Sequence, residues 1–286
     1  MSDLLLQPRS SVSPRPAGRA LERPVIPAVV AHRGSSAELP EHTLAAYEQA
    51  ISDGADGLEA DVRLTRDGHL VCLHDRRIDR TSNGRGAVSD LTLATLSTLD
   101  FGSWHAQGGA GADGEPVGGW SGGRCLTLEA LLELVSSAPC PVSLAVETKH
   151  PTRWSGLVER QLAHQLARFG LLRGRDGQLS QVRVMSFSSL ALRRARALMP
   201  ALALVQLTTR PLLVAPSGTS VWGPSIEVLR RRPELVGQAQ ARGRAVHVWT
   251  VDGAADLALC RDLGVDAVIT NRPAFALDVL TGSVAA

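Results

Sequence analysis

Short apolar runs alternate with stretches of helical spacing along most of the chain from residue 25 onward. Runs rich in Val, Leu, Ile and Ala are typical of parallel strands that are buried on both faces. The pattern predicts strands near 26–31, 56–62 with an extension near 69–73, 142–146, 182–186, 202–206, 219–222, 245–250 and 266–269. It predicts helices near 43–52, 127–133, 152–168, 188–198, 226–241, 253–262 and 273–280.

Eight strand–helix alternations within about 260 residues match the usual size of a (β/α)8 barrel. We therefore expect an α/β fold of the TIM-barrel type. A doubly wound open sheet is the alternative, because it is built from the same alternation.

The alternation breaks between residues 76 and 124, where Gly-rich stretches replace the helical pattern. This composition does not fit a barrel helix, so we interpret 76–124 as a small insertion after the second strand, partly loop, above one end of the core. Residues 1–24 hold Ser, Pro and Arg around one short apolar run, which predicts a disordered N-terminal tail. The barrel domain is expected to span residues 25–286.

The charge of the chain is nearly balanced. The net charge is +2, and residues 1–24 hold four Arg against Asp3 and Glu22, which is already +2. A nucleic-acid partner would need a clustered basic face and is not expected. The run Arg230-Arg231-Arg232 is assigned to a solvent-exposed helix face.

Neither a membrane span nor a disulfide framework is expected. No run of about 18 apolar residues is present, which argues against stable membrane insertion. The first residues lack the apolar centre of a signal peptide, which predicts a cytoplasmic location. The four cysteines, at positions 72, 125, 140 and 260, form no C-x-x-C pair and are expected to be buried free thiols.

Three carboxylates lie in or at the ends of predicted strands. Glu59 and Asp61 are two residues apart in one strand, and Glu147 follows the next. Residues i and i+2 of a strand share a face, and reactive residues of a barrel gather at the carboxyl ends of its strands, so the three should converge. Carboxylates without a cysteine partner suit one hard divalent cation, Mg²⁺ or Ca²⁺. The alternative for Glu59 and Asp61 is a surface strand edge paired to arginines.

Basic groups accompany these acids. His32 and His74 each end an apolar run and are candidates for a general acid and base. Arg33 can bind a phosphate with its fork, and Gly34 suits a close backbone approach or an unusual dihedral angle. Lys149 is the only lysine, so 29 of the 30 Lys and Arg residues are arginine. A lone ammonium two residues after Glu147 suggests a geometry that excludes a guanidinium.

Taken together, these groups resemble the glycerophosphodiester phosphodiesterase family over residues 27–275. The motifs that carry the resemblance are His32-Arg33-Gly34, Pro40-Glu41-His42-Thr43, Gly54 to Gly68, His74-Asp75, Glu147-Thr148-Lys149 and Trp249-Thr250-Val251. The resemblance implies a (β/α)8 barrel with a small insertion after the second strand. It also implies a divalent metal held by Glu59, Asp61 and Glu147, and a catalytic pair of His32 and His74.

Two positions depart from the family pattern. His42 stands where the family usually has Asn, which concerns the contacts behind the metal ligands. Thr148 replaces a residue that is more often aliphatic and should point away from the mouth of the barrel. Trp249, together with Phe187 or Trp222, is a candidate wall for the glycerol or head group of a substrate, with core packing as the alternative.

The sequence predicts a metal-dependent hydrolysis of glycerophosphodiesters to sn-glycerol 3-phosphate and an alcohol. Arg33 and Lys149 are expected to bind the phosphate. One histidine deprotonates water or the adjacent glycerol hydroxyl, and the other protonates the leaving oxygen. The alternatives are a phospholipase C- or D-like enzyme acting on intact or lyso lipids, and a non-enzymatic phosphoester-binding barrel. The expected partner is a small molecule, and the oligomeric state is left open.

Overall fold

Parallel strands close into a barrel. The computed structural model describes residues 26–106, 123–151, 156–174, 180–211 and 219–283. Within them, eight strands form the barrel: β1 (Ala28–His32), β2 (Gly57–Leu64), β4 (Ser143–Thr148), β5 (Val182–Ser186), β6 (Ala203–Thr208), β7 (Val221–Pro224), β8 (Ala245–Val248) and β9 (Ala267–Thr270). Strand β1 pairs in parallel with both β2 and β9, which closes the sheet. The barrel prediction is confirmed, and the open-sheet alternative is wrong.

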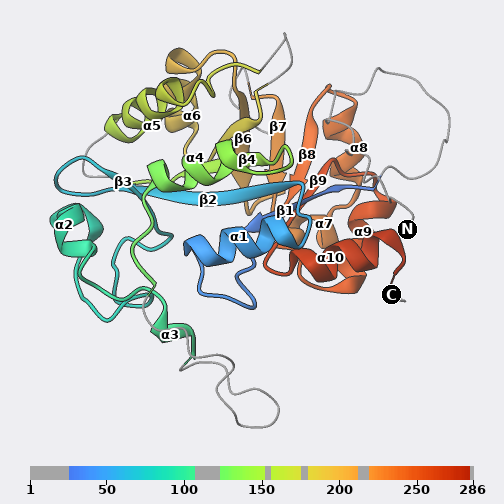
Figure 1. Cartoon of the computed structure of the whole chain (residues 1–286). Helices are drawn as coiled ribbons and strands as arrows, with labels where there is room; N and C mark the ends of the chain where they lie inside the picture. Colours follow the sequence, from blue (N-terminus) through green and yellow to red (C-terminus); the bar gives the residue numbers. More distant parts are fainter. Residues whose placement is uncertain (1–25, 107–122, 152–155, 175–179, 212–218, 284–286) are drawn as a thin grey trace.

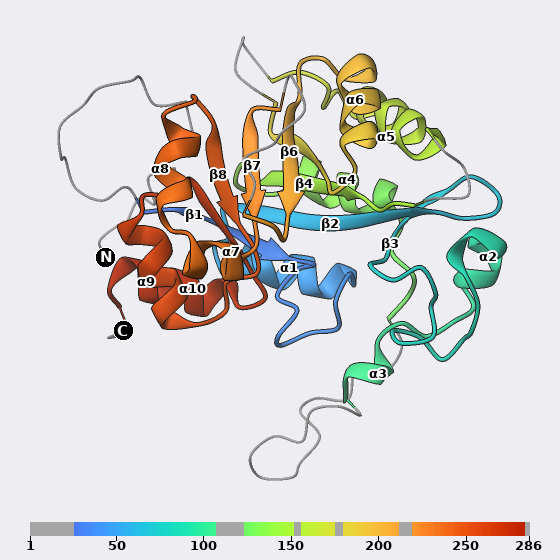
Figure 2. The same cartoon turned by 180° about the vertical axis from the view of Figure 1, so that it is seen from behind.

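Helices surround this barrel, as Figures 1 and 2 show from opposite sides. They are α1 (Leu44–Ser52), α4 (Leu128–Ser137), α5 (Leu157–Arg168), α6 (Ser189–Leu198), α7 (Ile226–Arg231), α8 (Glu234–Gln240), α9 (Ala254–Asp262) and α10 (Pro273–Thr281). The side chains of Thr43, Thr127 and Ser188 each accept a hydrogen bond from the backbone N–H three residues later. These N-caps explain why three of the helices begin close to the predicted positions.

One predicted helix is divided. Residues 226–241 form two helices, α7 and α8, and not the single predicted one. Pro233 has no backbone N–H and disfavours the helical region for the residue before it. Arg232 accordingly adopts φ −143° and ψ 62°. The neighbouring Arg230 and Arg231 are exposed, as the sequence predicted.

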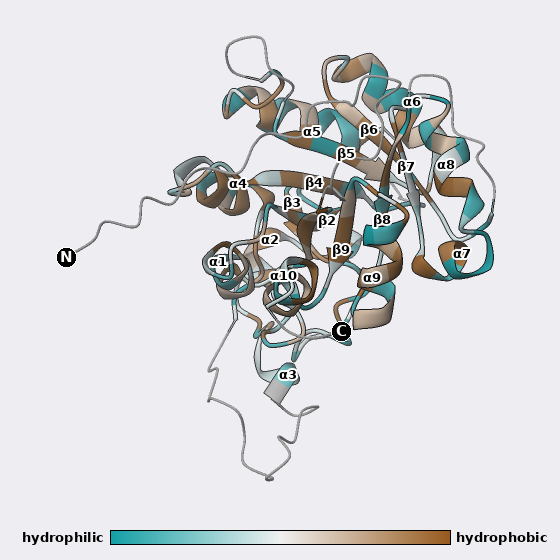
Figure 3. Ribbon diagram, turned by 90° about the vertical axis from the view of Figure 1, so that its right-hand side faces the viewer, coloured by the Kyte–Doolittle hydropathy of each residue, from teal (hydrophilic) through white to brown (hydrophobic). Residues whose placement is uncertain are grey.

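The core has two apolar layers, one outside the barrel strands and one inside them. Apolar side chains between the strands and the surrounding helices form two large clusters, one around Leu58, Leu144 and Leu192 and one around Trp222 and Val268. Figure 3 shows the apolar colour of the strands and the mixed colour of the helices around them. Inside the barrel, a smaller cluster is formed by Val30, Ala145, Met185, Val205, Leu207, Val221, Ala267 and Ile269. This inner cluster fills the barrel below the polar side chains at the carboxyl ends of the strands.

The segment after β2 is an excursion with its own small core. Strand β3 (Leu70–Cys72) pairs antiparallel with the end of β2, which is why β2 runs to Leu64, beyond its predicted end at residue 62. The short helices η1 (Val88–Asp90), α2 (Leu93–Leu96) and α3 (Ser103–Ala106) follow and lie to one side of the barrel in Figure 1. Their apolar side chains pack together in the cluster Val71, Leu73, Ile78, Val88, Leu96, Phe101 and Cys125. The described part of 76–124 is therefore a folded insertion, partly loop.

Other expectations have mixed outcomes. All four cysteines are free, and Cys72, Cys125 and Cys260 are buried, but Cys140 is exposed, so its predicted burial is wrong. Cys140 stands in the turn before β4, outside the apolar run that follows it. None of the helices in the described part of the chain is long and apolar enough to span a membrane. The predicted tail of residues 1–24, the stretch 107–122 and the start of the helix predicted from 152 lie outside the described residues.

Candidate active site

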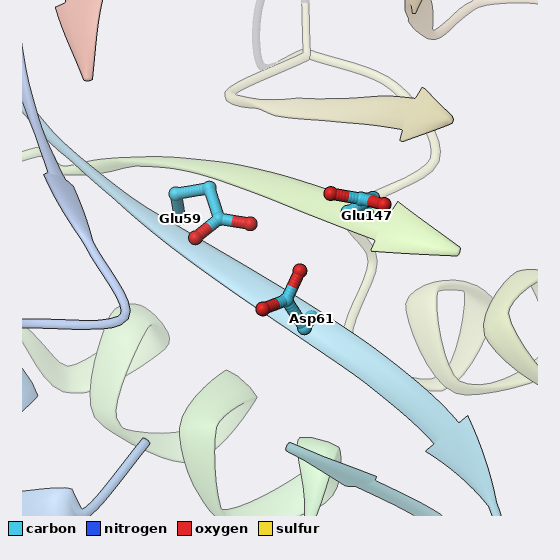
Figure 4. Close-up of side chains that lie close together, drawn as sticks. All are labelled: Glu59, Asp61 and Glu147. Carbon is cyan, nitrogen blue, oxygen red and sulfur yellow. The ribbon is translucent and has the colours of Figure 1, made fainter. Parts of the chain in front are cut away.

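Three carboxylates meet at the carboxyl ends of neighbouring strands. Glu59 and Asp61 lie on β2 and Glu147 lies on β4, with Asp61 and Glu147 paired across the two strands. Figure 4 shows how the three side chains gather. One oxygen of each lies within 4.8 Å of the others, and the residues are only 1%, 1% and 6% exposed. The convergence is the predicted one, and the alternative of a surface strand edge is wrong.

Two cations compensate part of this charge. The Nζ atom of Lys149 lies 2.9 Å from Oδ1 of Asp61 and 2.8 Å from Oε2 of Glu147. The Nε atom of Arg33 lies 3.0 Å from Oδ2 of Asp61, and the backbone N–H of Arg33 donates to Oε2 of Glu59. Arg33 and Lys149, the predicted phosphate-binding residues, therefore contact the acidic cluster directly.

The compensation is incomplete. Burial and the neighbouring Asp61 carboxylate raise the pKa of Glu147 to about 7, against the pull of Lys149. Burial and Asp61 also raise the pKa of Glu59 well above its ordinary value. Burial opposes ionisation of Asp61 as well, but the hydrogen bond from His42 and the charges of Lys149 and Arg33 hold its pKa well below the usual range. Ionisation of the two glutamates is thus disfavoured relative to an ordinary carboxyl, and a further cation would stabilise both as carboxylates.

The donor set fits a hard divalent cation. Only carboxylate oxygens are offered, which is the ligand type that Mg²⁺ and Ca²⁺ prefer. The buried Oδ1 of Asp61 has the Lys149 ammonium as its partner at 2.9 Å, so the acids are already arranged around one positive charge.

The turn after β1 brings His32 and Arg33 to this cluster. Arg33 and Gly34 adopt positive φ angles of 60° and 88°, so the chain reverses sharply after the strand. A Cβ at position 34 would lie 2.6 Å from the backbone carbon of Ala46 in α1. Both expectations for Gly34, a close approach and an unusual dihedral angle, are confirmed, and only glycine satisfies both.

The ring of His32 is fixed by a hydrogen-bonded chain that the sequence analysis missed. Its Nδ1 lies 2.7 Å from Oδ1 of Asn271, and the amide nitrogen of Asn271 donates to Oδ2 of Asp252 at 2.7 Å. The carboxylate of Asp252 can only accept, so the amide oxygen must face His32, and Nδ1 of His32 carries the hydrogen. Burial and Arg33 lower the pKa of His32 to about 4. The neutral ring therefore keeps an unprotonated Nε2, 4.0 Å from Glu59.

His74 follows β3, on the other side of the acidic cluster, with different partners. Its Nδ1 lies 2.7 Å from Oδ1 of Asp75, and its backbone carbonyl accepts two hydrogen bonds from Arg63. Burial and the charge of Arg33 lower the pKa of His74, while Asp75 opposes this shift. The two histidines thus differ in their partners. Nδ1 of His32 contacts the neutral amide of Asn271, and Nδ1 of His74 contacts the carboxylate of Asp75.

His42 contacts the site directly through Asp61, and its other ring nitrogen contacts Tyr47, the only tyrosine in the chain. The Nε2 atom of His42 lies 3.0 Å from Oδ2 of Asp61, and its Nδ1 lies 2.8 Å from the Tyr47 hydroxyl, which donates to the carbonyl of Glu59. His42 adopts a φ of 60°, a backbone region that Asn and His tolerate better than most residues. His42, which departs from the family pattern, therefore contacts and orients Asp61, a candidate metal ligand. Tyr47 was not predicted, because its i+5 spacing from His42 carries no signal of its own.

A cavity of about 290 Å³ connects these groups and has two unlike walls. One wall carries His32, Arg33, Glu59, His74, Glu147 and Lys149. The other carries Met185, Phe187, Leu207, Trp249, Thr250 and Ile269, where the rings of Phe187 and Trp249 meet edge to face at 5.3 Å. Trp222 is fully buried in the outer core, so its predicted place in the wall is wrong. Its neighbour on β7, Val221, takes the inward position of the pleat.

A second cavity of about 290 Å³ lies on the other side of His32 and Arg33. It is lined by those two residues together with Ser36, Ala37, Glu41, Asp252, Asn271 and Arg272. Thr148 is buried and lines neither cavity, in agreement with the expectation that it points away from the mouth.

Comparisons with known proteins agree with this geometry. The model of the glycerophosphoryl diester phosphodiesterase family matches residues 32–275. The chain is 47% identical to a probable glycerophosphodiester phosphodiesterase 1 of Mycobacterium tuberculosis, covering 86% of this chain and 90% of that protein. It is 34% identical to a glycerophosphodiester phosphodiesterase of Bacillus subtilis, covering 85% and 83%.

Solved structures show the same architecture. A phosphodiesterase from Oleispira antarctica, in complex with the product sn-glycerol-3-phosphate, superposes with a TM-score of 0.76 at 25% identity, covering 90% of this chain and 97% of that one. The barrel brings buried carboxylates, an arginine, a lysine and two histidines together. The family model and the relatives match this chain over most of its length, which establishes the family. The chain belongs to the glycerophosphoryl diester phosphodiesterase family.

Proposed function

We propose that this chain hydrolyses glycerophosphodiesters to sn-glycerol 3-phosphate and an alcohol, with one divalent cation held by Glu59, Asp61 and Glu147. The observation that carries the proposal is the convergence of these buried carboxylates with His32, His74, Arg33 and Lys149 around one cavity. The non-enzymatic alternative would be favoured by the loss of one of these groups, and all of them are in place.

The proposed roles follow from the contacts of each side chain. The guanidinium of Arg33 and the ammonium of Lys149 face the cavity beside the acids and are assigned to the non-bridging phosphate oxygens. A bound divalent cation would add positive charge at the same oxygens and stabilise the charge that develops in the transition state. The aromatic wall of Phe187 and Trp249 is assigned to the carbon skeleton of the substrate.

The hydrogen-bond partners assign the two histidines. His32 has its hydrogen on Nδ1, so its Nε2 lone pair is free to take a proton from the nucleophile, either water or the adjacent glycerol hydroxyl. The new P–O bond forms as the bond to the leaving alcohol oxygen breaks. That oxygen takes a proton from His74, whose charged form is stabilised by Asp75. His32 is thus the proposed base, and His74 is the proposed acid.

The apolar wall supports one alternative substrate. Phe187 lines the cavity and is 46% exposed. A lyso lipid is a phosphodiester with one long chain, and that chain would find an apolar contact at this ring. Lysophospholipids are therefore the second candidate substrate class. The cytoplasmic location and the absence of a nucleic-acid partner stay predictions from the sequence.

A coupled assay for glycerol 3-phosphate tests the proposal. The purified chain is assayed for glycerol 3-phosphate with glycerophosphocholine and glycerophosphoethanolamine, and for released choline with lysophosphatidylcholine, with EDTA and after addition of Mg²⁺ or Ca²⁺. We expect product from the two glycerophosphodiesters, loss of activity in EDTA and recovery with one of the ions. Glu147→Gln should abolish the recovery, and Glu234→Gln, an exposed carboxylate on α8, should not. Full turnover in excess chelator would overturn the metal assignment, and product from lysophosphatidylcholine alone would favour the second candidate.

A further inference from the structure

The guanidinium of Arg80, in the insertion, is held between two carboxylates that come from different parts of the chain. Its two terminal nitrogens donate to both oxygens of Glu41, at 2.7 and 2.8 Å. Its Nε donates to Oδ2 of Asp75 at 2.6 Å. The planar fork thus satisfies three donors at once, a geometry that an ammonium cannot reproduce.

Both carboxylates hold a residue of the proposed catalytic machinery with their other contacts. Oε1 of Glu41 accepts from the guanidinium of Arg33 at 3.0 Å. Oδ1 of Asp75 lies 2.7 Å from Nδ1 of His74. Arg80 therefore stands at the centre of a chain of hydrogen bonds that begins at His74 and ends at Arg33.

The two carboxylates in this chain are ionised at neutral pH. Burial alone would raise the pKa of Glu41 and of Asp75, but hydrogen bonds from Arg80, with further help from Arg33 and His74, lower each to about 2. Removal of the guanidinium would leave Asp75 with the contact to His74 and Glu41 with the contact to Arg33. Such carboxylates are free to rotate, and the side chains that they hold lose their fixed orientation.

Arg80 does not itself reach the substrate. It lines neither cavity, and its side chain is 44% exposed. Its guanidinium carbon lies 5.7 Å from the ring centre of Trp104, also in the insertion. The residues around it in the chain, among them Ile78 and Val88, belong to the small core of the insertion. The folded insertion therefore fixes where Arg80 stands.

We infer that Arg80 is a positioning residue that couples the insertion to the active site, orienting His74 through Asp75 and Arg33 through Glu41. The inference rests on the roles proposed above for His74 and Arg33. The insertion then contributes to the catalytic site, because its displacement would remove the contacts that orient both His74 and Arg33.

The test is a double-mutant cycle with glycerophosphocholine as substrate in saturating metal. Arg80→Gln should lower kcat about 10-fold or more through His74 and raise KM several-fold through Arg33. Arg80→Lys keeps the charge without the fork and should recover only part of this loss. Arg77→Gln is the matched control, because Arg77 lies in the same segment and its side chain pairs with the exposed Asp79. This control should match the parent.

The cycle separates positioning from a merely structural effect. In a His74→Ala background, Arg80→Gln should change the residual kcat by less than about twofold, and in an Arg33→Ala background it should no longer raise KM. If the guanidinium of Arg80 only stabilises the fold, Arg80→Gln should lower the melting temperature and reduce the activity of every background by the same factor. That result would overturn the inference. If Arg80→Gln does not fold, Asp75→Asn and Glu41→Gln should divide its effect, with the first lowering kcat and the second raising KM.

Parental kinetics in Arg80→Gln, together with an inactive His74→Ala, would refute the role of Arg80 alone. Normal turnover in His74→Ala would instead refute the proposed function of His74. The two failures are therefore distinguishable.

Discussion

The Nζ atom of Lys149 lies 2.8 Å from Oε2 of Glu147, two residues earlier in the chain. The same atom lies 2.9 Å from Oδ1 of Asp61 on the neighbouring strand, and Lys149 is only 8% exposed. One compact ammonium thus spans two carboxylates that are candidates for metal ligands. The single lysine of the chain therefore lies where a compact cationic group fits between carboxylates of two neighbouring strands.

Lys149→Arg should therefore not behave as a conservative change. A guanidinium is larger and planar, and it cannot occupy the position of the ammonium without displacing Asp61 or Glu147. We expect a melting temperature close to that of the parent and a loss of kcat/KM nearly as large as in Lys149→Ala. Steady-state kinetics and thermal unfolding of both variants check this. If Lys149→Arg is as active as the parent, the site does not require a compact ammonium at position 149.

Replacement of either His32 or His74 by Ala should lower kcat by at least about two orders of magnitude. His105→Ala and His164→Ala serve as controls, because neither ring lines the cavity. A substrate with an activated leaving group, such as a p-nitrophenyl diester, needs little protonation of the departing oxygen. It should therefore rescue His74→Ala and not His32→Ala. Rescue of His32→Ala alone would reverse the two roles.

Much of this site could be predicted from the sequence, because strand geometry is periodic. Residues 59 and 61 had to share a face, and barrel strands deliver their ends to one mouth, so the positions of Glu59, Asp61 and Glu147 followed once the fold was predicted. Burial of these groups also followed, because apolar residues flank them on both sides.

The partners that contact the candidate catalytic groups could not be predicted in the same way. Asn271 and Asp252 reach His32 only because β9 closes against β1, and Arg80 reaches Glu41 only through the path of an insertion without periodic pattern. The orientation of Trp222 depended on the register of β7, where a shift of one residue exchanges the inner and outer faces. Sequence periodicity locates side chains along an element, whereas these contacts depend on how distant elements meet.

His42→Asn should be tolerated, and His42→Ala should not. Asn accepts the left-handed backbone at this position and has an amide that can donate to Asp61. Ala would leave a buried oxygen of Asp61 and the Tyr47 hydroxyl each without one partner. We expect activity within a few-fold of the parent for Asn and a loss of about 10- to 100-fold in metal affinity or kcat for Ala. Metal titration of both variants by calorimetry checks this, and equal losses would show that His42 has a role an amide cannot fill.

His247 on β8 should make the fold sensitive to acid. The side chain is 5% exposed, and burial together with the nearby Arg183 lowers its pKa to about 3. In the unfolded chain a histidine takes up a proton below about pH 6.5, whereas the folded protein keeps His247 neutral. The unfolded state therefore binds more protons between these two values, and stability falls as the pH decreases through this window.

The loss from His247 alone should be about 2 kcal/mol between pH 6.5 and pH 5. His247→Gln removes the titrating group, so its free energy of unfolding in urea should fall by about 2 kcal/mol less than that of the parent between pH 7.5 and pH 5. His32 is buried in both proteins, and its contribution cancels in the comparison. His164→Gln, which changes an exposed ring on α5, should show the same acid loss as the parent. An equal loss in His247→Gln and the parent would mean that His247 is already protonated in the folded barrel.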